Sequence, residues 1–225
     1  MKIDKLVRTK RKTVALQISD RAEVVIRAPR WVSVNYILSF VSKHADWIEK
    51  RKKEINKKQV RTKKFVDGEE FLFLGEKYVL FRTLQGPSLG RARSVVLEGG
   101  VLYLPESIDD PKSAFEKWYK KKAKEYITRR VKEFARENNF EYNNIRITSA
   151  RTRWGSCSGK KNLSFSWRLI LAPQKVVDYV IVHELAHLRH MNHSKLFWHQ
   201  VEQLCPAYKE YKRWLRDKAE NLSDI

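Results

Sequence analysis

Histidines are concentrated in one short stretch of this sequence. Five of the six lie between His183 and His199. His183 and His187 are four residues apart, so on a helix both side chains project from the same face, one turn from each other. Two imidazole nitrogens in that arrangement can reach a single zinc ion at roughly 2.0–2.1 Å. The spacing therefore predicts a metal centre on a helix.

Glu184 directly follows the first of these histidines. One residue corresponds to about 100° of helical rotation, which keeps the carboxylate near the metal without making it a ligand. From there it can act as a general base that takes a proton from water. A structural zinc would use four protein ligands, often cysteines, and Cys157 and Cys205 are too far apart in the sequence to suggest such a set. We therefore predict an open, catalytic zinc site that activates water for hydrolysis.

Three residues are candidates for the third ligand. His190 is on the same helical face, but it lies roughly 10 Å from His183 along the axis, too far for a straight helix to wrap one ion. His193 is the better candidate, because residues 191–192 can end the helix and the serine after His193 can cap the next one. Glu202 is the rival that would give a two-histidine, one-carboxylate site. On spacing alone we favour His193 and keep the other two open.

The elements before this region are expected to be short. Alternating apolar residues and turn signals predict strands, and one longer stretch has helical spacing with Ser33 as its N-cap. The strands are predicted at 12–18, 23–28, 71–74, 77–83, 95–97 and 101–104, and the helix at 33–57. We therefore expect residues 1–108 to form a basic, mostly β lobe with one helix.

The second half of the chain is predicted to carry the site. Asp110 followed by Pro111 is a favourable helix start, and asparagines at 138–139 are a suitable end for that helix near residue 137. Strands are predicted at 144–150 and 163–170. Pro173 then begins the helix with the two histidines, whose other face is apolar. Residues 109–225 are expected to form an α+β catalytic domain in which this helix packs on a small sheet.

The charge of the chain is its most unusual bulk property. The sequence has 47 Lys+Arg against 26 Asp+Glu, a formal net charge of +21. A surface of that sign attracts polyanions, so nucleic acids, nucleotides and anionic membrane faces are candidate partners. The sequence has no apolar run long enough for a signal peptide or a membrane span. We expect a cytoplasmic protein in which both cysteines are thiols.

Several short segments carry a resemblance to a known family. They are Arg153–Ser158, Trp167–Leu169, Pro173, Asp178–Val180, His183–His187, Asn192–Ser194 and Phe197–Trp198. Together they resemble the YgjP-like (DUF45) metallopeptidase-domain family, which is related to the SprT-like zincins. The resemblance covers roughly residues 140–205. It implies a zincin-like fold, zinc held by His183, His187 and His193, and Glu184 as the catalytic residue.

Three functions are compatible with these features. The first, which we favour, is a zinc metallopeptidase acting on peptide or protein substrates. The second is a metal-dependent phosphohydrolase of nucleoside triphosphates, with Arg151, Arg153 and Arg168 binding phosphate. Three histidines favour zinc, however, whereas triphosphate chemistry usually uses magnesium on carboxylates. The third is a nucleic-acid-binding module with a relict metal site.

Several further residues are candidates for supporting roles in hydrolysis. Hydrolysis of an amide also needs a group that stabilises the developing oxyanion, and Arg151, Arg153 and Tyr179 are available. Asp178 could orient a ligand imidazole or interact with the dipole of its own helix. The loop at 151–158 is expected to shape a substrate groove.

Overall fold

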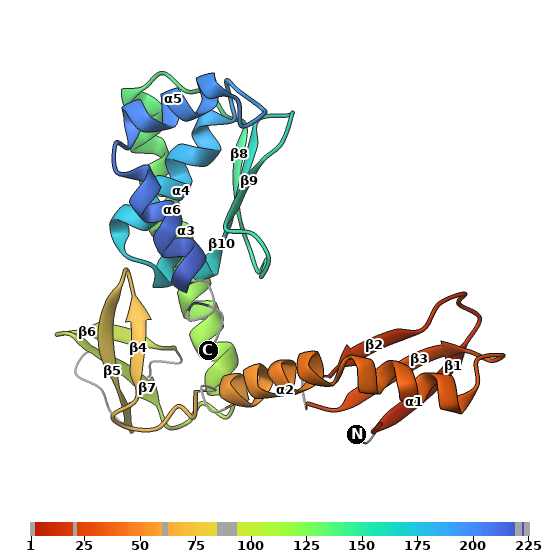
Figure 1. Ribbon diagram of the computed structural model, residues 1–225. Coiled ribbons are helices and arrows are strands. Elements are labelled where there is room, and N and C mark those ends of the chain that lie inside the picture. Colours follow the sequence, from red (N-terminus) through yellow and green to blue (C-terminus); the bar gives the residue numbers. More distant parts are fainter. Residues whose placement is uncertain (1–2, 20–21, 60–62, 85–93, 219–221, 223–225) are drawn as a thin grey trace. The chain divides into compact units, whose positions relative to one another are not determined.

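The chain folds as two compact units, Met1–Thr62 and Lys63–Ile225 (Figure 1). The computed structural model describes residues 3–19, 22–59, 63–84, 94–218 and 222. Helices and small sheets occur in both units, and each unit has its own hydrophobic core. The α+β prediction is confirmed.

The first unit is a three-stranded sheet with two helices. Its strands are β1 (Lys5–Thr9), β2 (Ala15–Ile18) and β3 (Val24–Pro29). They are ordered β1-β3-β2, with β3 parallel to β1 and antiparallel to β2. The helices are α1 (Val34–Lys43) and α2 (Ala45–Gln59). The sequence predicted one helix here, but the chain breaks at His44, and it did not predict β1, whose residues alternate little in polarity.

The second unit begins with a four-stranded sheet. Its strands are β4 (Glu70–Phe73), β5 (Glu76–Thr83), β6 (Val96–Glu98) and β7 (Val101–Pro105), in the order β4-β5-β7-β6. The long helix α3 (Pro111–Glu137) follows. The Asp110 side chain caps this helix by accepting a hydrogen bond from the Ser113 amide at 3.0 Å. These four strands and the two ends of α3 agree with the sequence prediction.

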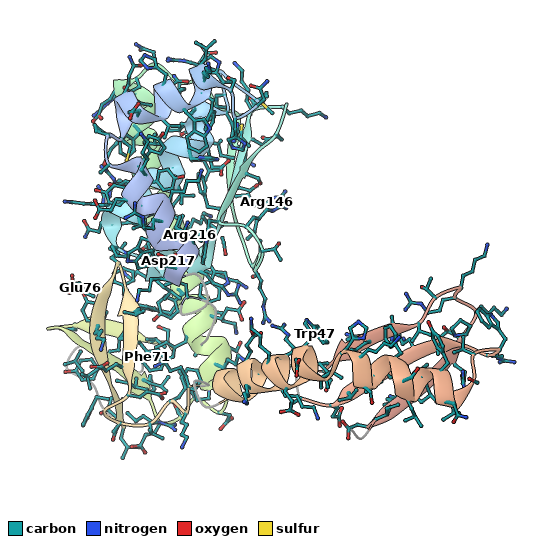
Figure 2. The ribbon with its side chains drawn as sticks, viewed as in Figure 1. Trp47, Phe71, Glu76, Arg146, Arg216 and Asp217 are labelled. Atoms are coloured by element: carbon teal, nitrogen blue, oxygen red, sulfur yellow. The ribbon has the colours of Figure 1, made fainter. Side chains whose placement is uncertain are left out.

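The four-stranded sheet and α3 share one core. Phe71 of β4, labelled in Figure 2, stacks on Phe115 of α3 with ring centroids 4.3 Å apart. The Tyr119 hydroxyl donates to the Leu72 carbonyl at 2.7 Å. The compact units therefore divide after residue 62, and not after residue 108 where the sequence pattern placed the lobe boundary. Residues 63–108 pack against the helices of the C-terminal half and share one hydrophobic core with them.

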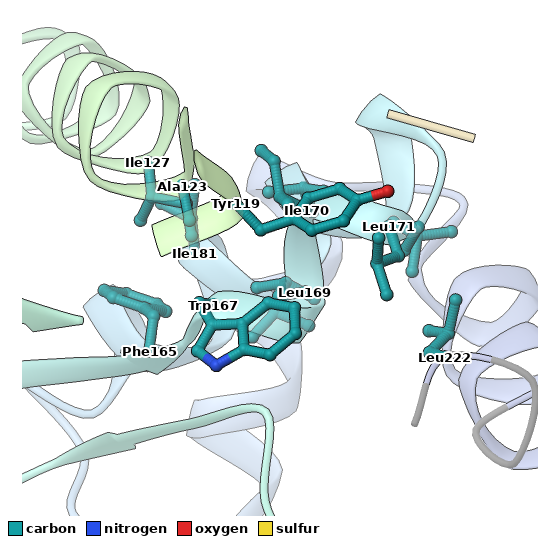
Figure 3. Packing of buried hydrophobic residues seen from close by; sticks show 14 of the residues in the cluster. Tyr119, Ala123, Ile127, Phe165, Trp167, Leu169, Ile170, Leu171, Ile181 and Leu222 are labelled. Carbon is teal, nitrogen blue, oxygen red and sulfur yellow. The ribbon is translucent and has the colours of Figure 1, made fainter. Parts of the chain in front are cut away.

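A second small sheet and a 3-10 helix lie next to the site. The strands are β8 (Asn144–Thr148), β9 (Gly155–Cys157) and β10 (Asn162–Ser166), in the order β8-β10-β9. The predicted strand at 163–170 stops early, because Trp167–Leu171 form the 3-10 helix η1 and bury all five side chains. Trp167 stacks on Tyr119 of α3 at 5.7 Å between centroids (Figure 3).

Three helices complete the second unit. They are α4 (Gln174–Ala186), α5 (Lys195–Leu204) and α6 (Tyr208–Lys218), and Arg216 and Asp217 mark the end of α6 in Figure 2. Nine of the 13 residues of α4 are buried, so this helix is central to the core. Within the described part of the chain, no helix is both long and apolar enough to cross a membrane.

All three sheets contain the same arrangement of three strands. The third strand along the chain lies in the middle, parallel to the first and antiparallel to the second. The arrangement recurs as β1-β3-β2, β5-β7-β6 and β8-β10-β9.

Candidate metal centre

The end of α4 determines where its histidines lie. The helix ends at Ala186, five residues earlier than the sequence suggested. Tight turns follow, in which the amide of Leu188 donates to the Leu185 carbonyl at 3.0 Å and that of Arg189 to the Ala186 carbonyl at 3.1 Å. His187 therefore occupies the C-cap, still in a helical conformation. The early end lets the chain fold back over the face that carries His183.

That reversal brings three histidines together. The ligand nitrogens of His183, His187 and His193 all lie within 4.8 Å of one another, and the Nε2 atoms of His183 and His193 are 3.1 Å apart. Within the described ranges they are the one group of three or more potential metal ligands. Glu202 is exposed on α5, where its carboxylate lies 3.5 Å from Lys209 Nζ. It takes no part in the group.

His190, the remaining candidate ligand, acts through its main chain. The His187 Nδ1 atom lies 3.0 Å from the His190 carbonyl oxygen. A carbonyl only accepts hydrogen bonds, so Nδ1 carries the ring proton and Nε2 keeps a free lone pair. A hydrogen bond of this kind orients a metal-binding imidazole and selects its tautomer. Sequence reasoning missed this contact, because no residue type signals a main-chain partner.

Aromatic side chains of α5 support the three imidazoles. The Phe197 ring is fully buried, and its centroid lies 4.6–4.9 Å from those of His183, His187 and His193. Trp198 stacks on His193 at 5.6 Å with an interplanar angle of 22°. The helix α5 can present both rings because Ser194 caps it, as the sequence predicted.

Side chains of α6 form a second layer that packs on Trp198. Tyr208 of α6 stacks on the indole at 5.4 Å, and Lys212 Nζ lies 4.3 Å from the ring centroid. The stacked side chains of His193, Trp198 and Tyr208 thus connect the turn after α4 to α6.

Glu184 is almost completely enclosed, with 5% of its surface exposed. The backbone of β9 lies directly against it. A Cβ atom built on Gly155 would be 2.5 Å from Glu184 Oε1 and 2.6 Å from its Cγ. Position 155 must therefore be glycine for this close approach. The motif around residue 155 was noted in the sequence, but β9 itself was expected to be loop.

Burial sets the protonation of these groups. It lowers the pKa of His183 to about 3, helped by the neighbouring His187 and His193, and it lowers the pKa of His187 as well. Both imidazoles are thus neutral, which is the form that binds metals. Burial also raises the pKa of Glu184 to about 8, against the opposing charge of Arg153. A carboxylate with a raised pKa is a stronger base once it is ionised.

The candidates for oxyanion stabilisation lie on two sides of the group. Arg151 and Arg153 are exposed on the loop before β9, and Arg153 is near enough to act on the pKa of Glu184. Tyr179 lies one turn before His183 on α4, with ring centroids 6.0 Å apart. Cys157 of β9 is half-buried, and the charge of Glu184 contributes to raising its pKa, after burial.

Two other residues have structural partners. Asp178 accepts two hydrogen bonds from Arg130 of α3, at 2.9 and 2.8 Å, and so links α3 to α4 instead of orienting an imidazole. Arg168 is 6% exposed and donates to the Ser149 carbonyl at 3.1 Å. Its guanidinium also lies 4.3 Å from the Trp167 ring centroid. An arginine so placed is not accessible to a phosphate in solution.

The protein thus has an α+β fold in which three histidine side chains converge, an arrangement suited to holding a metal ion. Residues 12–218 match the family described as YgjP-like, metallopeptidase domain. The match spans well over half of the chain, so this protein belongs to that family, and the resemblance of the short segments is confirmed. A metallopeptidase domain acts on peptide or protein substrates.

One solved structure is also similar in part. It is the crystal structure of the metallopeptidase zymogen of Pyrococcus abyssi abylysin, with 21% sequence identity and a TM-score of 0.37. The similarity covers 40% of this chain and 93% of that one. At this level the likeness carries no functional argument. No curated protein matches the sequence significantly.

Proposed function

We propose that this protein is a zinc-dependent metallopeptidase in which His183, His187 and His193 hold the metal and Glu184 is the general base. The observation that carries the proposal is the convergence of three imidazole nitrogens beside one buried carboxylate. Family membership supports the peptidase class, and the donor set supports the choice of metal.

The three donors fit zinc. Two ligands of one tetrahedral zinc ion are roughly 3.4 Å apart, and the two facing Nε2 atoms of His183 and His193 are separated by 3.1 Å. Imidazole nitrogen suits zinc better than magnesium, which prefers oxygen. The set leaves a fourth position open, as catalytic zinc sites do. His187 is already held in the tautomer that offers Nε2.

The residues of the chain then have distinct tasks. Bound zinc supplies Lewis-acid chemistry, which polarises a carbonyl group and makes water acidic near neutral pH. Glu184 accepts the proton of the attacking water and delivers it to the leaving nitrogen. The β9 backbone at Gly155 lies directly against its side chain and leaves little space on that side. Arg153, whose charge acts on the pKa of Glu184, or Tyr179, whose ring centroid lies 6.0 Å from that of His183, would stabilise negative charge on the scissile carbonyl oxygen.

Metal content and hydrolysis, measured on the same preparations, test the proposal. We expect one zinc per chain in wild type and in Glu184→Gln, and little in His193→Ala. Wild type should hydrolyse an unfolded protein, and Glu184→Gln should not. Glu202→Gln, which removes the exposed carboxylate of α5, is the matched control and should retain both properties.

Two results would reject this assignment. Zinc retained in His193→Ala would exclude the proposed ligand set. Hydrolysis of nucleoside triphosphates without hydrolysis of protein would favour the phosphohydrolase, although the buried Arg168 and the absence of a carboxylate from the described histidine group weigh against it.

A further inference from the structure

The first unit carries a groove of about 630 Å³ at one end. Three segments form it: the loop between β1 and β2, the turn between β3 and α1, and one flank of α1. Its lining includes Lys12 and Thr13 from the loop, Trp31 from the turn, and Tyr36 and Phe40 from the helix. All of them belong to Met1–Thr62, so the groove is a property of this unit alone.

Two large aromatic side chains of the groove are exposed to solvent. Trp31 is 78% exposed and Tyr36 is 56% exposed. No other aromatic ring or cation within the described ranges packs on either of them. Exposed rings whose faces are uncovered offer flat apolar surface to a ligand. Their exposure is not explained by the fold, because the core of this unit is complete without them.

The turn that carries Trp31 is nevertheless held in place. The Arg8 guanidinium donates to the carbonyl oxygens of Pro29 at 2.8 Å and Val32 at 2.7 Å. Ser33 then caps α1 by accepting from the Tyr36 amide at 3.2 Å. Trp31 therefore projects from an ordered backbone, which lowers the entropy that binding would cost.

Cationic residues also lie on, or next to, the segments that form the groove. Lys10, Arg11 and Lys12 lie on its loop and Arg30 precedes its tryptophan, all exposed and none in an ion pair with any residue that the structure describes. Residues 1–62 hold 17 Lys+Arg against 6 Asp+Glu, a net +11 out of the chain's +21. About half of the excess charge thus falls on little more than a quarter of the sequence.

We propose that this groove binds single-stranded nucleic acid, with bases stacked on Trp31 and Tyr36 and phosphates held by the cations beside them. Stacking platforms within a basic groove are the usual means of binding single strands. A duplex hides its base faces and could not use the rings. A neutral peptide could use the rings but would leave the cations without partners. Nucleic-acid binding by this groove would not require the metal site of the second unit.

The test uses the full chain and a fluorescein-labelled oligothymidylate of 15 nucleotides, followed by fluorescence anisotropy at 50 and 200 mM salt. Trp31→Ala and Tyr36→Ala should each weaken binding about tenfold or more, as loss of a stacked base does. Trp47→Ala is the matched control, because this tryptophan of α2, labelled in Figure 2, is 47% exposed and does not line the groove. It should bind like wild type.

Salt dependence tests the charges separately. The double variant K10Q/K12Q should reduce the slope of log affinity against log salt by about one. K50Q/K53Q removes the same charge from exposed positions on α2 and should change the slope less. Circular dichroism of each variant checks that the fold is intact.

Three outcomes would overturn the proposal. One is that Trp31→Ala binds the oligonucleotide as tightly as Trp47→Ala. Another is that a duplex of equal length binds wild type as tightly as the single strand. The third is that wild type binds phosphatidylserine vesicles in a Trp31-dependent manner while showing no affinity for the oligonucleotide at 50 mM salt, which would assign the surface to a membrane.

Discussion

The contact between Gly155 and Glu184 shows how closely a single residue can be constrained by its neighbours. The carboxylate lies in the core of the second unit and has the β9 backbone against its side chain. A residue in such a place can be moved by adding one methyl group to the opposite strand. The orientation of the proposed base therefore depends on a position that has no functional group.

We predict that Gly155→Ala lowers peptidase activity without removing the metal. The new Cβ would lie 2.5 Å from Glu184 Oε1, so the carboxylate must rotate away from its present position. A displacement near 1 Å in an active site can cost roughly 10²-fold in rate. Turnover of an unfolded protein and zinc content, measured together, check this. Gly159→Ala is the control, because a Cβ there meets no atom within 4 Å.

A second residue-scale prediction concerns Trp198. Its ring stacks on the proposed ligand His193 and also on Tyr208 of α6. Trp198→Leu should weaken zinc binding by about 10-fold or more, as loss of a group that orients a ligand does. Trp198→Phe should recover part of that loss. Competition with a coloured chelator measures the affinity, and Leu196→Ala, on the exposed side of α5, should leave it unchanged.

The sequence predicted site residues best where residue type and spacing alone indicate the chemistry. His183, Glu184 and His187 could be placed on one helix because an i, i+4 pattern needs only local geometry. His193 was favoured through the helix stop and the cap after it. The hydrogen bond from His187 to the His190 carbonyl could not be anticipated, because main-chain partners depend on how the turn closes.

At the scale of elements, the α4–α5 connection joins two parts of the proposed site. His183 and His187 belong to α4, while His193 immediately precedes the cap of α5. Arg189, within the connection, donates to the carbonyl oxygens of Asn138 and Asn139 after α3 at 2.7 and 3.3 Å. The connection is thus fixed by a contact outside the histidine group.

Metal removal should therefore lower stability without unfolding the protein. A ligand that binds only the folded state adds about 2.7 kcal/mol when its concentration is 100 times Kd. We expect chelation with 1,10-phenanthroline to lower the thermal midpoint, and one equivalent of zinc to restore it. His193→Ala should lack this response, whereas Glu202→Ala should show it. Equal responses in the two variants would contradict the proposed third ligand.

Elements with strong local signals were predicted well. The four strands of the first sheet in the second unit and the whole of α3 follow from alternation and from caps. The sequence did not show that residues 167–171 leave the sheet as a 3-10 helix or that β9 pairs with β10, because both depend on contacts with α3 and α4.

At the scale of the whole molecule, the main difference between the sequence prediction and the structure is the position at which the chain divides into two units. Sequence composition placed the boundary after residue 108, because the basic β-rich character continues to that point. Core packing overrides composition: Leu80, Leu102 and Leu104 of the sheet are fully buried in the same cluster as Phe115 and Tyr119 of α3. Residues 109–225 and this sheet therefore share one hydrophobic core.

A fragment of residues 63–225 should consequently fold by itself, whereas one of 109–225 should not. The shorter fragment lacks six buried apolar residues of the core: Phe65, Phe71, Leu80, Val95, Leu102 and Leu104. At about 1.5–3 kcal/mol each, their loss costs roughly 9–18 kcal/mol. That is as large as the whole stability of a typical domain. Thermal unfolding followed by near-ultraviolet circular dichroism distinguishes the two; a sharp transition in 109–225 would refute the expectation.

The strand arrangement shared by the three sheets has a consequence for synthesis of the chain. The strands β1 and β8 emerge from the ribosome before any strand that pairs with them, since the partner of each is the third strand of its sheet. The strand β5 can pair at once with β4, but its other edge also waits for the third strand of the arrangement, β7. The second strand of each arrangement likewise pairs only when that third strand arrives. Each three-strand arrangement is therefore completed only when its central strand arrives, and a pause in translation just before β3, β7 or β10 would leave unpaired strand edges open to other chains.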